Sequence, residues 1–146
     1  MAIRHGQPLI EHDQVILASA ATYEKFRSKG FLVSVNLTGK PVHNIGGSNF
    51  PDVIVWRTGG DFGKTEIIEE IETSETVTDQ EAKEWDKYSR FGATFYLIVP
   101  KDSMDRAEEI VKRLGIKVDA IEGYYFDYHS QVKFITRQPH KHGERE

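Results

Sequence analysis

The sequence predicts a single α/β domain with a mixed central sheet flanked by helices. Short runs of apolar, strand-favouring residues alternate with stretches that have the apolar periodicity of helices, and turn-forming residues separate the two kinds. The chain has 146 residues, of which 38% are hydrophobic and 29% charged, and this suits one globular domain with its own core. We expect the order α-β-β-β-α-β-α-β within residues 1–136, followed by a polar, flexible tail at 137–146.

The first half of the chain is expected to hold one helix and three strands. Residues 11–29 carry apolar side chains at three- and four-residue spacing, and Gly30 follows as a helix stop. Strands separated by turns, the last turn at 58–63, are expected at 31–37, 51–56 and 65–73. The 65–73 segment could instead be helical, because glutamate is a poor strand former. Three strands in succession suggest an antiparallel meander.

The second half is marked by helix caps and stops. Thr78 and Glu81 have the spacing of a capping box and predict a helix that ends near residue 92. A buried strand at 93–99 follows, and then a helix that is capped by Asp102 or Ser103 and stopped by Gly115. One or two further strands are expected at 118–136. The β-α-β step across 93–123 suggests a parallel crossover.

Composition excludes several classes of protein. The chain has no cysteine, so disulfides and thiolate metal sites are excluded, and a cytoplasmic location is expected. No apolar run approaches the roughly 20 residues of a membrane span, and the first residues lack the apolar stretch of a secretory signal. The formal net charge of −4 gives no overall attraction to nucleic acid, although local basic patches can still bind it.

Three carboxylates form the candidate site. Asp52 directly precedes a run of apolar strand residues, and Glu70 and Glu72 project to the same face if their segment is a strand. Because neighbouring strands lie roughly 4.8 Å apart, the three side chains can converge. Like charges in such a space raise one another's pKa unless a cation neutralises them, and oxygen ligands favour Mg²⁺ or Mn²⁺. The sequence therefore predicts a divalent-metal site, with a solvated acidic strand as the alternative.

The pattern around these residues resembles the PD-(D/E)xK nuclease superfamily. Pro51-Asp52, 17 intervening residues and then Glu70-Ile71-Glu72 at the end of a strand resemble its motif, and the order of elements across about residues 10–123 is similar. The resemblance implies that Asp52 and Glu70 bind Mg²⁺. Glu72 stands where the family's motif has a lysine that helps to activate water.

The resemblance also suggests further residues for the site. Lys64 on the same strand and Lys83 on the next helix are candidates to replace the missing lysine. Glu84 and Tyr88 match the spacing of a Gln-x-x-x-Tyr feature of some nuclease branches, with Glu in place of Gln. Glu24 on the first helix could add a carboxylate, or could be a surface charge.

Two functional hypotheses follow. The first is a Mg²⁺-dependent endonuclease that hydrolyses phosphodiesters in DNA, as a homodimer or with an unseen protein partner. The second is a nuclease-like domain without turnover that binds nucleic acid or protein. A third interpretation, an α/β protein unrelated to nucleases with an acidic strand, would follow if the 65–73 segment were helical or if Asp52 lay far from Glu70.

Overall fold

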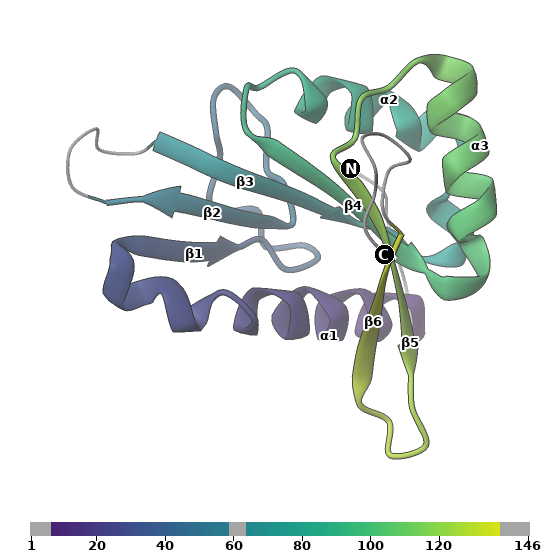
Figure 1. Ribbon diagram of the computed structural model, residues 1–146, viewed down its shortest axis with the longest axis horizontal. Helices are drawn as coiled ribbons and strands as arrows, with labels where there is room; N and C mark the ends of the chain where they lie inside the picture. Colours follow the sequence, from purple (N-terminus) through teal and green to yellow (C-terminus); the bar gives the residue numbers. More distant parts are fainter. Residues whose placement is uncertain (1–6, 59–63, 138–146) are drawn as a thin grey trace.

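The computed structural model describes residues 7–58 and 64–137. Within them the chain forms one mixed sheet with helices on both of its faces, which confirms the predicted fold class (Figure 1). Most of the turn expected at 58–63, and the expected tail beyond its first residue, Arg137, lie outside the described residues.

Six strands make the sheet. In the order in which they lie side by side they are β1 (Phe31–Val35), β2 (Val53–Arg57), β3 (Lys64–Ile71), β4 (Thr94–Pro100), β5 (Ala120–Phe126) and β6 (Val132–Arg137). The first three form the predicted antiparallel meander, so the segment that could have been helical is a strand. β4 pairs parallel with β3, and β5 pairs parallel with β4, as the β-α-β step predicted. β5 and β6 form an antiparallel hairpin, so the C-terminal segment contains two strands.

Helices cover the two faces unequally. They are α1 (Gln7–Ala21), α2 (Asp79–Ser89) and α3 (Met104–Leu114), with the short 3₁₀ turns η1 (Glu24–Lys29), η2 (Ser74–Thr76) and η3 (Lys101–Ser103). On one face α2 and α3 pack over a core that includes Ile68 and Leu97, and on the other α1 packs over Val53 and Ile71. Because side chains alternate along a strand, even-numbered residues at the end of β3 face α2 and odd-numbered residues face α1. None of the described helices has the length and apolarity needed to cross a membrane.

The first helix differs from its predicted bounds. Within the described residues it runs from Gln7 and ends at Ala21 rather than continuing to residue 29. Thr22 Oγ1 donates to the Ser19 carbonyl, and the chain then tightens into η1. Side-chain to backbone bonds of this kind compete with helical bonds, and this explains a break that apolar periodicity does not reveal.

Several predicted caps and stops are confirmed. Gly30 and Gly115 adopt the left-handed conformation, with φ of 89° and 69°, where they end η1 and α3. Thr78 Oγ1 accepts the Glu81 N–H at 3.2 Å and so caps α2. Ser103, one of the two residues expected to cap α3, occupies the N-cap position, but its side chain makes no capping hydrogen bond.

Candidate functional site

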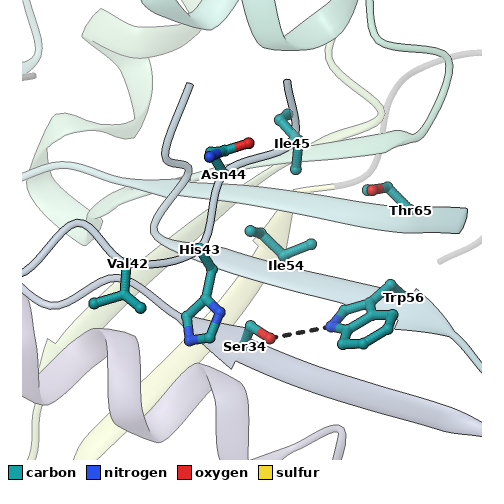
Figure 2. A pocket seen from close by; sticks show the side chains of 8 residues that line it. All are labelled: Ser34, Val42, His43, Asn44, Ile45, Ile54, Trp56 and Thr65. Carbon is teal, nitrogen blue, oxygen red and sulfur yellow. Dashed lines mark hydrogen bonds between the residues drawn. The ribbon is translucent and has the colours of Figure 1, made fainter. Parts of the chain in front are cut away.

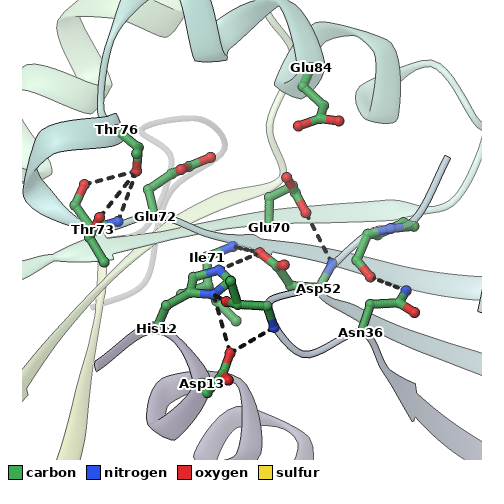
Figure 3. A network of polar contacts seen from close by, with 12 residues as sticks. His12, Asp13, Asn36, Asp52, Glu70, Ile71, Glu72, Thr73, Thr76 and Glu84 are labelled. Atoms are coloured by element: carbon green, nitrogen blue, oxygen red, sulfur yellow. Dashed lines mark hydrogen bonds and ion pairs between the residues drawn. The ribbon is translucent and has the colours of Figure 1, made fainter. Parts of the chain in front are cut away.

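Asp52 and Glu70 meet where β2 begins and β3 ends (Figure 3). The Asp52 N–H donates to Glu70 Oε1 at 3.0 Å, and Asp52 Oδ2 accepts the Ile71 N–H at 2.8 Å. Val53 and Glu69 form the adjacent backbone pair, so these two side-chain bonds continue the β2–β3 ladder beyond it. Asp52 and Glu70 are therefore in contact, but through the Asp52 backbone N–H, and the Asp52 carboxylate is bonded to other groups.

His12 of α1 holds the Asp52 carboxylate from the other side. Its Nε2 lies 3.2 Å from Asp52 Oδ2 and its Nδ1 lies 2.7 Å from Thr38 Oγ1. A proton on Nε2 satisfies both contacts, because Nε2 then donates to the carboxylate and Nδ1 accepts from the hydroxyl. The imidazole is only 2% exposed, so it fixes the carboxylate from within the core.

Glu70 points to the opposite face, toward α2. Oxygen atoms of Glu70, Glu81 and Glu84 all lie within 4.8 Å of one another. Figure 3 shows Glu84 directed from its helix toward Glu70. Glu70 is 5% exposed, and no lysine or arginine among the described residues forms an ion pair with it. This acidic cluster lies where a divalent ion could bind several carboxylate oxygens.

Glu72 shares the face of Glu70, as its position two residues later predicted, but its carboxylate is engaged elsewhere. It is fully buried, and its Oε2 accepts the indole N–H of Trp85 at 2.8 Å. Neither Glu72 nor Asp52 belongs to the close acidic group found among the described residues. The additional carboxylates near Glu70 come from α2 instead.

Burial and mutual repulsion destabilise the ionised forms of these acids. Burial raises the pKa of Glu70 well above its ordinary value, and the charges of Asp52, Glu72 and Glu84 raise it further. Burial and the charge of Glu81 raise the pKa of Glu72 in the same way, although hydrogen bonds from Thr76 and Trp85 oppose the rise. A bound cation would remove the repulsion, so the donor set fits a hard divalent ion.

The predicted basic residues lie at different distances from the acids. Lys64 begins β3 six residues before Glu70, which at about 3.3 Å per residue is roughly 20 Å away and out of reach of a lysine side chain. Lys83 and Lys87 lie on α2, and together with Gln80, Glu81 and Glu84 they line a surface pocket. Lys83 is therefore the predicted lysine that lies beside the acidic cluster.

The two remaining candidates differ in burial. Glu24 is exposed on η1 and forms an ion pair with Arg27 at 2.9 Å, which agrees with a surface charge. Tyr88 is 1% exposed, and its hydroxyl donates to Glu84 Oε2 at 3.4 Å. Burial, followed by the charges of Glu70 and Glu84, raises the pKa of Tyr88, so its hydroxyl stays protonated and can act as a donor. The Glu84–Tyr88 spacing thus brings both side chains to the acidic cluster.

Sequence reasoning missed two residues at this site. His12 has no metal-binding spacing, but it occurs three and four positions before the buried Val15 and Ile16, and this spacing marks an inward-facing residue. Glu81 was considered only as a cap, although its position three residues before Glu84 places both on one side of α2.

No protein-family model, curated protein or solved structure matches the chain.

Proposed function

We propose that the protein is a divalent-metal-dependent endonuclease that hydrolyses phosphodiesters in DNA, with a variant PD-(D/E)xK site. The observation that carries the proposal is the contact of Asp52 with a buried glutamate, Glu70, which also lies in a tight cluster with Glu81 and Glu84. Its supporting context is the α-β-β-β-α-β order, in which the acids lie at the end of β3 and beside α2.

Glu70 and Glu84 would hold Mg²⁺ or Mn²⁺, with Glu81 as a further oxygen ligand. Carboxylates alone make up the cluster, and ions of this kind prefer oxygen ligands. A bound divalent ion would polarise the phosphate and make the attacking water more acidic. The Asp52 N–H holds one Glu70 oxygen in place, so the orientation of this carboxylate does not depend on a flexible side chain alone.

The surrounding residues would position and neutralise charge. His12 and the Ile71 N–H orient the Asp52 carboxylate at the rim of the site. Lys83, exposed on α2 beside the acids, would offset negative charge on the phosphate in the role that the motif lysine has in the family. A homodimer would bring two such sites to the two strands of a duplex.

One observation favours the second candidate, a domain that binds nucleic acid without cleaving it. The carboxylates of Asp52 and Glu72 already accept hydrogen bonds from His12, Ile71 and Trp85, and Glu72 stands in place of the motif lysine. Such a domain would use the same surface but would not require a divalent ion.

Cleavage of supercoiled plasmid in Mg²⁺ or Mn²⁺ separates the two candidates. We expect nicking by the wild-type protein and its loss in Glu70→Gln and Glu84→Gln, which remove charge but keep side-chain volume. Glu24→Gln is the matched control, because Glu24 is exposed on η1 and belongs to no part of the cluster. Equal nicking by all four proteins would assign the activity to a contaminant and contradict the proposal. Absence of nicking in both metals would favour the binding domain.

A further inference from the structure

A second pocket lies over the antiparallel half of the sheet (Figure 2). Ile54 in its floor pairs with Ile68, which packs under α2, so the pocket is on the same face as Glu70. It has a volume of about 340 Å³. Ser34, Ile54, Trp56 and Thr65 form its floor from β1, β2 and β3, and residues 42–45 form its wall. A volume above about 300 Å³ is in the range of small-ligand sites.

The loop that forms the wall is held by one buried side chain. Asn36 is 3% exposed, and its amide group donates to the carbonyls of His43 and Pro51, each at 2.7 Å. Its side-chain oxygen accepts the N–H groups of Val42 at 2.8 Å and His43 at 2.7 Å. Three of these four hydrogen bonds hold the wall and the fourth ties it to Pro51, so the pocket is already formed without a ligand.

The floor offers a flat ring in a fixed orientation. The indole N–H of Trp56 donates to Ser34 Oγ at 3.0 Å, and the ring is only partly buried. A β-bulge between Val55 and Trp56 brings Trp56 opposite Thr65, so both line the pocket. Aromatic rings held in this way are the platforms on which unpaired nucleobases stack. The lining also includes the polar side chains of His43 and Asn44 in the wall and of Thr65 in the floor, which could form hydrogen bonds with the edge of a base.

The acids and the pocket lie at different positions along the same pair of strands, β2 and β3. Asp52 and Glu70 lie at one end of the β2–β3 pair, whereas Arg57 and Lys64 pair across the strands at the other end. Arg57 forms an ion pair with Glu66 and lies over the ring of Phe31, which packs on the α1 face, so Arg57 points away from the pocket. Lys64 is exposed at the start of β3 and, as the cross-strand partner of Arg57, projects to that same face. Trp56 lies four residues along β2 from Asp52, about 13 Å at 3.3 Å per residue. An extended nucleic-acid strand could cover this distance within a few nucleotides.

We propose that this pocket binds an unpaired base of a DNA strand, stacked on Trp56, while the strand continues toward Glu70. The inference deepens the proposed function because it names the substrate as single-stranded or locally unpaired DNA.

Tryptophan fluorescence in EDTA tests the pocket without catalysis. We expect a ten-residue oligothymidylate to quench the emission and to bind Trp56→Ala about 5- to 150-fold more weakly, the range for loss of one stacked base. Trp56→Phe keeps a ring and should retain most of the affinity, measured by fluorescence anisotropy of a labelled strand. Trp85 is fully buried, so it provides a background emission that DNA does not quench.

Unchanged binding by Trp56→Ala would overturn the proposal. Equal affinity for thymidine monophosphate and for the oligomer would also overturn it, because the site would then bind a free nucleotide. If Trp56→Ala proves unfolded by circular dichroism, Asn44→Ala on the wall replaces it, with the expectation of weaker oligomer binding. Binding without any cleavage in Mg²⁺ would contradict the proposed endonuclease but support the pocket. Cleavage that Trp56→Ala leaves intact, together with unchanged binding, would contradict only the pocket.

Discussion

Glu69 is a buried carboxylate on the face of the sheet opposite to the acidic cluster, and replacing it with glutamine should change the pH dependence of stability. It is 1% exposed and accepts hydrogen bonds from Ser19 Oγ and Tyr23 Oη. Burial raises its pKa from 4.5 to about 7, the two hydrogen bonds oppose the rise, and the charges of Glu122 and Asp52 add to it.

The size and sign of the effect follow from this pKa. A pKa raised from 4.5 to about 7 corresponds to about 3 kcal/mol of proton-linked free energy. The folded protein keeps this proton in a pH range where the unfolded chain has released it. The contribution of Glu69 to the free energy of unfolding is therefore greatest below pH 4.5, falls as the pH rises to about 7, and is constant above that.

Urea unfolding of the metal-free protein in EDTA, at several pH values from 5 to 8, measures the effect. We expect the stability of wild type relative to Glu69→Gln to fall across this range by most of about 3 kcal/mol. Tyr23→Phe provides a second variant, because it removes a donor that stabilises the ionised form and should shift the fall to higher pH. A difference between wild type and Glu69→Gln that stays constant with pH would refute the reasoning.

Three further substitutions, measured by urea unfolding, test the contacts of the pocket wall, of the core under α3 and of Glu72. Asn36→Ala removes three hydrogen bonds to the pocket wall and one to Pro51, and it should lower the free energy of unfolding by about 3 kcal/mol. A loss below about 1 kcal/mol would mean that the loop is held by other contacts. Gly123→Ala would place a Cβ 2.4 Å from Met104 Sδ, and we expect a cost of about 1–3 kcal/mol from overpacking, whereas no cost would show that the methionine simply turns away. Trp85→Phe removes the indole donor to the buried Glu72 carboxyl group and should cost about 1–3 kcal/mol. An unchanged free energy of unfolding would contradict this role.

The fold was largely predictable because its signals are local. Glycines after the helices, a threonine cap at Thr78 and short apolar runs mark the element ends, and the three-strand meander followed from their order. The break after Ala21 was not predictable from apolar periodicity, because it combines the bond of Thr22 to the Ser19 carbonyl with the contact of Tyr23 to Glu69, on a strand far away in the sequence. Such a contact depends on tertiary packing and leaves no periodic pattern.

The candidate site was predictable in part. Strand parity placed Glu70 and Glu72 on one face, and Asp52 lies next to Glu70, which it contacts through its backbone N–H rather than its carboxylate. Parity alone could not show that Glu72 would turn to Trp85, or that Glu81 and Glu84 would complete the cluster, because both depend on how α2 packs on the sheet. Glu69 is buried on the α1 face and needs polar partners there. Only the fold identifies these partners as Ser19 and Tyr23.

The central claim is that Glu70 and its neighbours bind a divalent ion, and thermal unfolding with and without millimolar Mg²⁺ or Mn²⁺ tests it most directly. The relevant quantity is the rise in melting temperature that the metal causes, since removal of a buried charge changes the melting temperature by itself. We predict a saturable rise for wild type and for Glu24→Gln, and none for Glu70→Gln or Glu84→Gln. A wild-type melting temperature that neither ion changes, or an equal rise in Glu70→Gln, would contradict the account.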